Sequence, residues 1–185
     1  MEERRFADPR TFPTPIRLSR MSTTTADPTL DRLLRHMAWA NGHLVAWLAA
    51  QPADVLGLTA PRNEWSAGRI LAHLLNAAAG YATRMEGVPR PPDVDEPTSA
   101  SDLADIAAKL ADVDARLRAQ AVEPDVLISH PKRPDQNDFR STILGQAIHH
   151  ATEHRAQIAG ALATNGNDAI DLDAIDLWEH ADAGG

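Results

Sequence analysis

Apolar residues recur three and four positions apart along most of the chain, which is the pattern of amphipathic helices. The pattern predicts four long helices over about residues 29–50, 67–86, 101–121 and 141–164. A shorter amphipathic piece follows at about 171–181, and we expect its apolar side to cover one end of the bundle or an interface. The residues expected on that side are Leu172, Ile175 and Trp178.

Capping residues mark the predicted helix boundaries. Ser66 and Ser141 are predicted N-caps, because a serine side chain can accept hydrogen bonds from the N–H groups of the first helical turn. Gly87 is predicted to end the second helix, and Asn165 with Gly166 the fourth.

Proline-rich segments separate the later helices. Residues 89–97 are predicted to form an extended connector, and residues 124–134 a loop. No stretch alternates apolar and polar residues as a half-buried strand would. We therefore expect an all-α fold, a four-helix bundle with long connections and a short C-terminal helix.

The first 28 residues show neither helical nor strand periodicity and contain several prolines and charges. We expect them to form a disordered tail in front of a single domain over residues 29–182. Met21 opens the sequence MSTTTADPTLD, which reads like a natural start. We therefore hypothesise that the first 20 residues are an over-long gene start.

Composition narrows the classes of partner. Acidic residues number 26 against 18 basic ones, and the resulting charge of −8 would repel nucleic acid. No apolar run approaches the roughly 20 residues of a membrane-spanning helix, so a cytoplasmic protein is expected. The chain has no cysteine, which leaves histidine and carboxylate groups as candidate metal ligands.

Two histidines in the fourth predicted helix share its inward face. His150 and His154 are four residues apart, in phase with the apolar stripe of Ile143, Ala147 and Ile158. Two imidazoles that face a core need polar partners, because an unpaired buried polar group costs about 1–3 kcal/mol. A shared hydrogen-bond network and a shared metal ion both meet that need.

A third histidine, His73, lies in the apolar run ILAHLLNAAAGYA of the second predicted helix and should also face the core. Three inward histidines from two apposed helices fit a site for one divalent metal ion, with open positions for water or substrate. Neutral imidazole suits Zn²⁺, Ni²⁺ or Fe²⁺. The predicted metal ligands are therefore His73, His150 and His154.

Glu153 is the candidate catalytic residue, as a general base beside the metal. It completes an H-x-x-E-H pattern that also occurs in inverted zinc peptidases. Those enzymes need a further downstream carboxylate ligand in a larger α/β scaffold, which the remaining sequence does not offer. Because Glu153 lies about 60° around the helix from His150, a solvent-exposed charge is the alternative role.

The remaining histidines have other expected roles. His149 points about 100° away from His150, and His180 is near a chain end that we expect to fray. His36 and His43 lie close to one face of the first predicted helix, where they would support the site or form a partly exposed stripe. His130 lies in the proline-rich loop, where it could line the mouth of a site.

These residues resemble the DinB/YfiT-like superfamily of bacterial metal-binding four-helix bundles. The resemblance covers about residues 29–182 and rests on the segments LLRHMAWAN, EWSAGRILAHLLNA, HHATEHRAQIAGAL and DLWEH. It implies that His73, His150 and His154 hold the metal. Two positions depart from the family pattern: Glu153 replaces a usual histidine, and Ala156 replaces the glycine of R-G-Q.

The resemblance also implies a homodimer and a small-molecule substrate. Members associated with mycothiol or bacillithiol use such a metal to transfer the thiol to electrophiles. We therefore expect a metal-dependent transferase that activates a low-molecular-weight thiol, mycothiol-like, for attack on a small electrophile. The alternatives are a metal-dependent hydrolase and a non-catalytic metal-binding stress-response protein.

Overall fold

A computed structural model describes residues 26–60 and 64–185, and it confirms the predicted all-α bundle. Residues 1–25, which make up most of the predicted tail and include Met21, lie outside the described residues. The long helices are α1 (Pro28–Ala49), α2 (Ala67–Glu86), α3 (Ala100–Ala119) and α4 (Arg140–Ala163). The shorter elements are the 3₁₀ helices Ala53–Gly57, Gln120–Val122 and Asp173–Ile175, the strands β1 (Leu127–His130) and β2 (Arg133–Phe139), and helix α5 (Leu177–Asp182).

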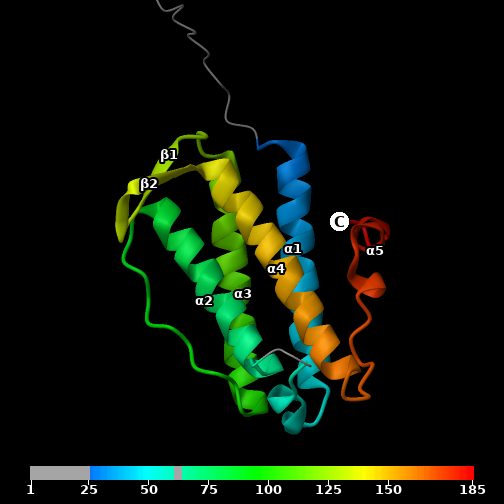
Figure 1. The fold of residues 1–185 in the computed structure, drawn as a ribbon. Helices are drawn as coiled ribbons and strands as arrows, with labels where there is room; N and C mark the ends of the chain where they lie inside the picture. Colours follow the sequence, from blue (N-terminus) through cyan, green and yellow to red (C-terminus); the bar gives the residue numbers. More distant parts are fainter. Residues whose placement is uncertain (1–25, 61–63) are drawn as a thin grey trace, which may run out of the picture.

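The four long helices surround one apolar core (Figure 1). Helix α1 packs against α3 and α4, and α2 packs against the same two helices. The order around the bundle is therefore α1, α3, α2, α4. Among the described residues, no helix has the length and apolar character needed to cross a membrane.

The long connector between α2 and α3 follows from helix direction. Figure 1 shows α2 and α3 running the same way, so the chain must return along the bundle before α3 begins. The connector, residues 87–99, runs outside α2 and is held there by Asn76. The Asn76 side chain donates to the Val94 carbonyl (3.0 Å) and accepts from the Val94 N–H (2.8 Å), as a neighbouring strand would.

Most predicted helix boundaries are confirmed. Ser66 caps α2 by accepting a hydrogen bond from the N–H of Arg69 at 3.0 Å. Gly87 ends α2 in the left-handed conformation, with φ of 69°. The predicted N-cap at Ser141 is wrong, because β2 runs directly into α4 and Phe139 takes that position. Ser141 instead donates from its N–H and hydroxyl groups to Asp125, both at 2.9 Å.

The predicted loop between α3 and α4 contains an antiparallel hairpin of β1 and β2, which the sequence pattern did not indicate. Both strands are largely exposed, so they lack the apolar alternation of a half-buried sheet. A side chain from α2 anchors them instead. The Arg84 guanidinium donates to the carbonyls of Ile128 (2.7 Å) and Ser129 (3.2 Å) and to the Asp138 carboxylate (2.8 Å).

The short C-terminal helix packs against α1, but its inward residues differ from the prediction. Ile175 is buried, whereas Trp178 is 79% exposed. A break at Asp176, which caps α5, separates the two residues and changes the helical phase. His180 is buried there and does not lie at a frayed end: its ring centroid is 5.3 Å from that of Trp39 and 5.7 Å from that of His36.

A polar cluster lies inside the bundle where α1, α3 and α4 meet. Asn41, Asp114 and Arg155 are each no more than 4% exposed. The Asn41 amide donates to the Asp114 carboxylate at 3.0 Å and accepts from the Arg155 guanidinium at 2.7 Å. Burial raises the pKa of Asp114 to about 6 and lowers that of Arg155 to about 10. Asn41 therefore links two buried charges.

We expect Asn41→Leu to lower the free energy of unfolding by about 3 kcal/mol, because it leaves both charged groups without a buried partner. Denaturant unfolding at neutral pH measures this. The control is Gly42→Ala in the same helix, where an added Cβ would meet no atom within 4 Å. It should be neutral or stabilising by up to about 1 kcal/mol. Equal effects in the two variants would contradict this role for Asn41.

The raised pKa of Asp114 predicts a pH dependence of stability. The native state holds this proton more tightly than the unfolded chain, so the Asp114 contribution to stability falls as pH rises from about 4 to about 6. A shift of this size corresponds to about 3 kcal/mol. Unfolding curves of wild type and Asp114→Asn should therefore show a stability difference that changes across this window. A difference that is constant with pH would refute the assignment.

Candidate metal centre

The three predicted histidines meet between α2 and α4. The Nε2 atom of His150 lies 3.2 Å from Nε2 of His73 and 2.9 Å from Nε2 of His154. One ligand atom from each residue lies within 4.8 Å of the others. His154 is buried, and His73 and His150 are partly buried. The helical phase read from the sequence thus brings all three imidazoles to one point.

Hydrogen bonds alone do not explain this convergence. An imidazole nitrogen carries either one in-plane proton or one lone pair, so Nε2 of His150 can direct only one good hydrogen bond. It nevertheless faces two other Nε2 atoms. Three lone pairs directed at one cation remove the conflict. Tetrahedral coordination at the usual zinc–nitrogen distance would separate the nitrogens by about 3.3 Å, close to the observed spacings.

Gln157 determines the tautomer of His154. The Gln157 side-chain oxygen lies 2.7 Å from Nδ1 of His154, and an amide oxygen only accepts, so Nδ1 carries the proton. The Gln157 amide nitrogen in turn donates to the Glu153 carboxylate at 3.3 Å, which supports this orientation of the amide. A neutral His154 therefore presents the lone pair of Nε2 to the other two histidines.

The surroundings favour neutral imidazoles. Burial, followed by the neighbouring His154 and His73, lowers the pKa of His150 to about 4. Burial also lowers the pKa of His73, with further contributions in the same direction from His154 and Arg90. Both rings are therefore uncharged at neutral pH, which is the form that coordinates metal ions.

Aromatic side chains from α2 and the residues before it flank the histidines. The Trp65 ring lies edge-on to His73, with centroids 4.9 Å apart, and the Tyr81 ring lies edge-on to His150 at 5.8 Å. Burial raises the pKa of Tyr81, although a hydrogen bond with Gln146 partly opposes this shift. The Tyr81 phenol therefore keeps its proton at neutral pH.

A cavity of about 1320 Å³ opens beside His73. Its walls come from α2, the connector, the hairpin and the first turns of α4. Typical small-ligand sites measure about 300–1,000 Å³, so this cavity has room for more than one small molecule. Three of the residues described above, Trp65, Tyr81 and Gln146, line it together with His73.

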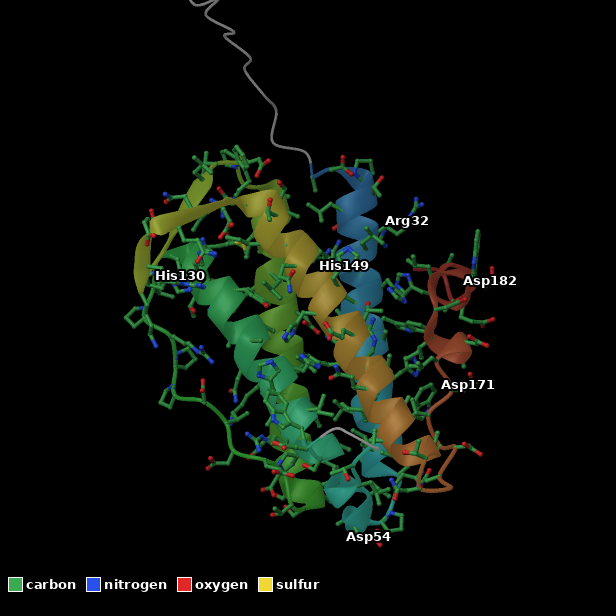
Figure 2. All side chains as sticks on the ribbon, viewed as in Figure 1. Arg32, Asp54, His130, His149, Asp171 and Asp182 are labelled. Atoms are coloured by element: carbon green, nitrogen blue, oxygen red, sulfur yellow. The ribbon has the colours of Figure 1, made fainter. Side chains whose placement is uncertain are left out.

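The other predicted candidates lie away from the three Nε2 atoms. Glu153 is exposed and reaches His154 only through Gln157, so its geometry does not match a base facing the metal. His149 is exposed on α4, and His130 lies on the hairpin, where it lines the cavity as the sequence suggested (Figure 2). His36 donates from Nε2 to the Ile175 carbonyl at 2.8 Å, where α1 meets the 3₁₀ helix that precedes α5. His43 packs between Trp39 and Trp47 on the same helix.

Sequence reasoning missed several residues that shape the site. Gln157 carried a usable signal, since it follows His154 by three positions and therefore lies on the same helix face. Tyr81 lies in the apolar run of the second predicted helix, but its contact with His150 depends on how α2 and α4 pack. Arg69 and the hairpin residues reach the cavity only through tertiary structure.

The fold and the histidine cluster define a helical bundle that could hold one metal ion between two of its helices. The DinB family model matches residues 21–182, and the chain belongs to the DinB family. A search of curated proteins finds no match to the chain.

We expect Gln157→Leu to weaken metal binding by about 10- to 100-fold, because the variant no longer orients the His154 ring. Competition with a chromogenic chelator measures the affinity. Glu153→Gln should have a smaller effect, since it keeps the side-chain shape and removes only the charge. Unchanged affinity in Gln157→Leu would show that the His154–Gln157 hydrogen bond does not support the ligand.

Proposed function

We propose that this protein binds one divalent metal ion through His73, His150 and His154 and transfers a low-molecular-weight thiol to a small electrophile. The observation that carries the proposal is the convergence of three imidazole Nε2 atoms beside a large cavity. Zn²⁺, Ni²⁺ and Fe²⁺ all suit such a donor set.

Three protein ligands leave coordination positions open, which is the arrangement of catalytic metal sites; structural zinc sites usually have four protein ligands. A metal ion bound here would lower the pKa of a coordinated thiol or water. The protein supplies neutral imidazoles, kept so by burial, and a cavity that opens at His73.

The transfer has a simple balance of bonds. The thiol loses its proton to solvent, and its sulfur forms a bond to the electrophilic carbon. In a substitution, the leaving group departs with the electron pair of the bond that breaks. In an addition, the electron pair of the attacked multiple bond moves onto another atom of the substrate, and that atom then takes up a proton. Tyr81 is the proton-bearing side chain beside His150, and we propose that its hydroxyl stabilises this developing charge.

The size of the cavity favours thiol transfer over metal-dependent hydrolysis, because it exceeds the usual size for one small ligand and so accommodates a thiol and a second substrate. The absence of cysteine is compatible with thiol transfer, in which the thiol comes from a bound molecule. Hydrolysis needs only water as the second reactant, and turnover without added thiol would identify it.

We expect His150→Ala to lose both the bound metal and thiol transfer, because it removes the central ligand of the three. The adjacent His149→Ala is a matched control, since His149 is exposed on the same helix. The measurements are elemental analysis of untagged protein and an absorbance assay with low-molecular-weight thiols and an activated aryl halide. Thiol transfer retained by His150→Ala would overturn the proposal, and so would a metal-free wild type after exposure to Zn²⁺, Ni²⁺ and Fe²⁺.

A further inference from the structure

We propose that Arg69 recognises a carboxylate group on the electrophilic substrate. This inference rests on the proposed function, to which it adds the chemical class of one substrate: a small carboxylic acid. Arg69 lines the same cavity as His73 and precedes it by four residues on α2, so the two side chains lie one turn apart on one helix face.

Trp65 holds the Arg69 guanidinium in place. The guanidinium carbon lies 4.8 Å from the centre of the Trp65 ring, and the same ring contacts His73. Stacking on an indole leaves the N–H groups at the edge of the guanidinium available, and these donors match the two oxygens of a carboxylate. Trp65 thus places a directed cation near His73.

Arg69 forms no ion pair with any carboxylate among residues 26–60 and 64–185. The neighbouring acid, Glu96, accepts a hydrogen bond from the Ser66 hydroxyl. By contrast, two other arginines of the cavity are paired: Arg84 with Asp138 at 2.8 Å and Arg90 with Asp93 at 2.5 Å. Arg69 is therefore the arginine of α2 that can take a new anion.

The position of Arg69 does not serve helix stability. It lies in the first turn of α2, where the helix dipole disfavours a positive charge, and this turn contains no acidic residue. The protein has a net charge of −8, and helix stability does not explain a positive charge at this position. Binding of an anionic ligand explains it.

The spacing limits the size of the substrate. The Arg69 guanidinium carbon lies 4.8 Å from the centre of the Trp65 ring, which in turn lies 4.9 Å from the centre of the His73 ring. A carboxylate bound to Arg69 is therefore one short carbon chain away from His73. Lys132 and Arg133 also line the cavity, but they belong to the hairpin that Arg84 anchors, about four turns from Arg69 along α2. They are too distant to hold the same short acid.

The test compares two electrophiles of the same shape, crotonate and the neutral crotonamide. Binding to the full-length protein is followed by NMR titration with and without added Zn²⁺. We expect crotonate to bind wild type more tightly than crotonamide, and Arg69→Gln to weaken crotonate binding by about tenfold while crotonamide is unaffected. Arg32→Gln is the charge-matched control, an exposed arginine on α1 (Figure 2).

Equal affinities of wild type for the two probes would overturn the assignment. An equal loss of crotonate binding in Arg69→Gln and Arg32→Gln would also overturn it, because only general electrostatics would then be at work. Arg69-dependent binding that persists without zinc supports the assignment whether or not thiol transfer is observed. The transfer assay with His150→Ala tests the proposed function separately, so the two failures are distinguishable.

Discussion

The contact between α2 and α4 is constrained by three imidazole nitrogens that meet at one point. His150 faces both His73 and His154 at hydrogen-bond distance, and one nitrogen cannot form two directed hydrogen bonds at once. The packing of the two helices thus creates a point that suits a cation, and burial there lowers the pKa values of His73 and His150. Gln157 contributes by orienting His154 from the side away from the cluster. The candidate site thus depends on interhelical geometry as much as on its ligands.

The residue after His154 on α4 points about 100° away from it, toward a different part of the bundle interior. Arg155 directly follows His154 but joins the buried cluster with Asn41 and Asp114, between α1 and α3. Rotation of α4 about its axis would disturb the histidines on one side and these buried charges on the other. Burying charges is expensive unless they are paired, so this cluster restricts the rotation more specifically than apolar packing would. The stability of the bundle and the geometry of the site are therefore linked through two adjacent residues.

The cavity is a consequence of topology. Because α2 and α3 run the same way, the connector must pass along α2, where Asn76 holds it as one wall. The hairpin forms another wall and is attached to α2 through Arg84. A compact bundle with short loops would leave His73 facing either core or solvent. The long connections instead enclose a space that is open to His73.

Helix positions, several caps and the inward phase of His73, His150 and His154 follow from the sequence alone, because helical periodicity and capping are local properties. The DinB resemblance read from the same segments is confirmed by the family match. Metal binding by the three histidines stays a prediction.

Other features depend on partners distant in sequence. The exposed hairpin forms where Arg84 anchors it, Phe139 caps α4 because β2 leads into it, and Trp178 faces solvent because Asp176 interrupts the C-terminal helix. The contact between Glu153 and Gln157 is local, because the two residues are four apart on α4. Tertiary structure decided that Arg69 and Trp65 line a cavity, because the connector and the hairpin that complete its walls come from distant parts of the sequence.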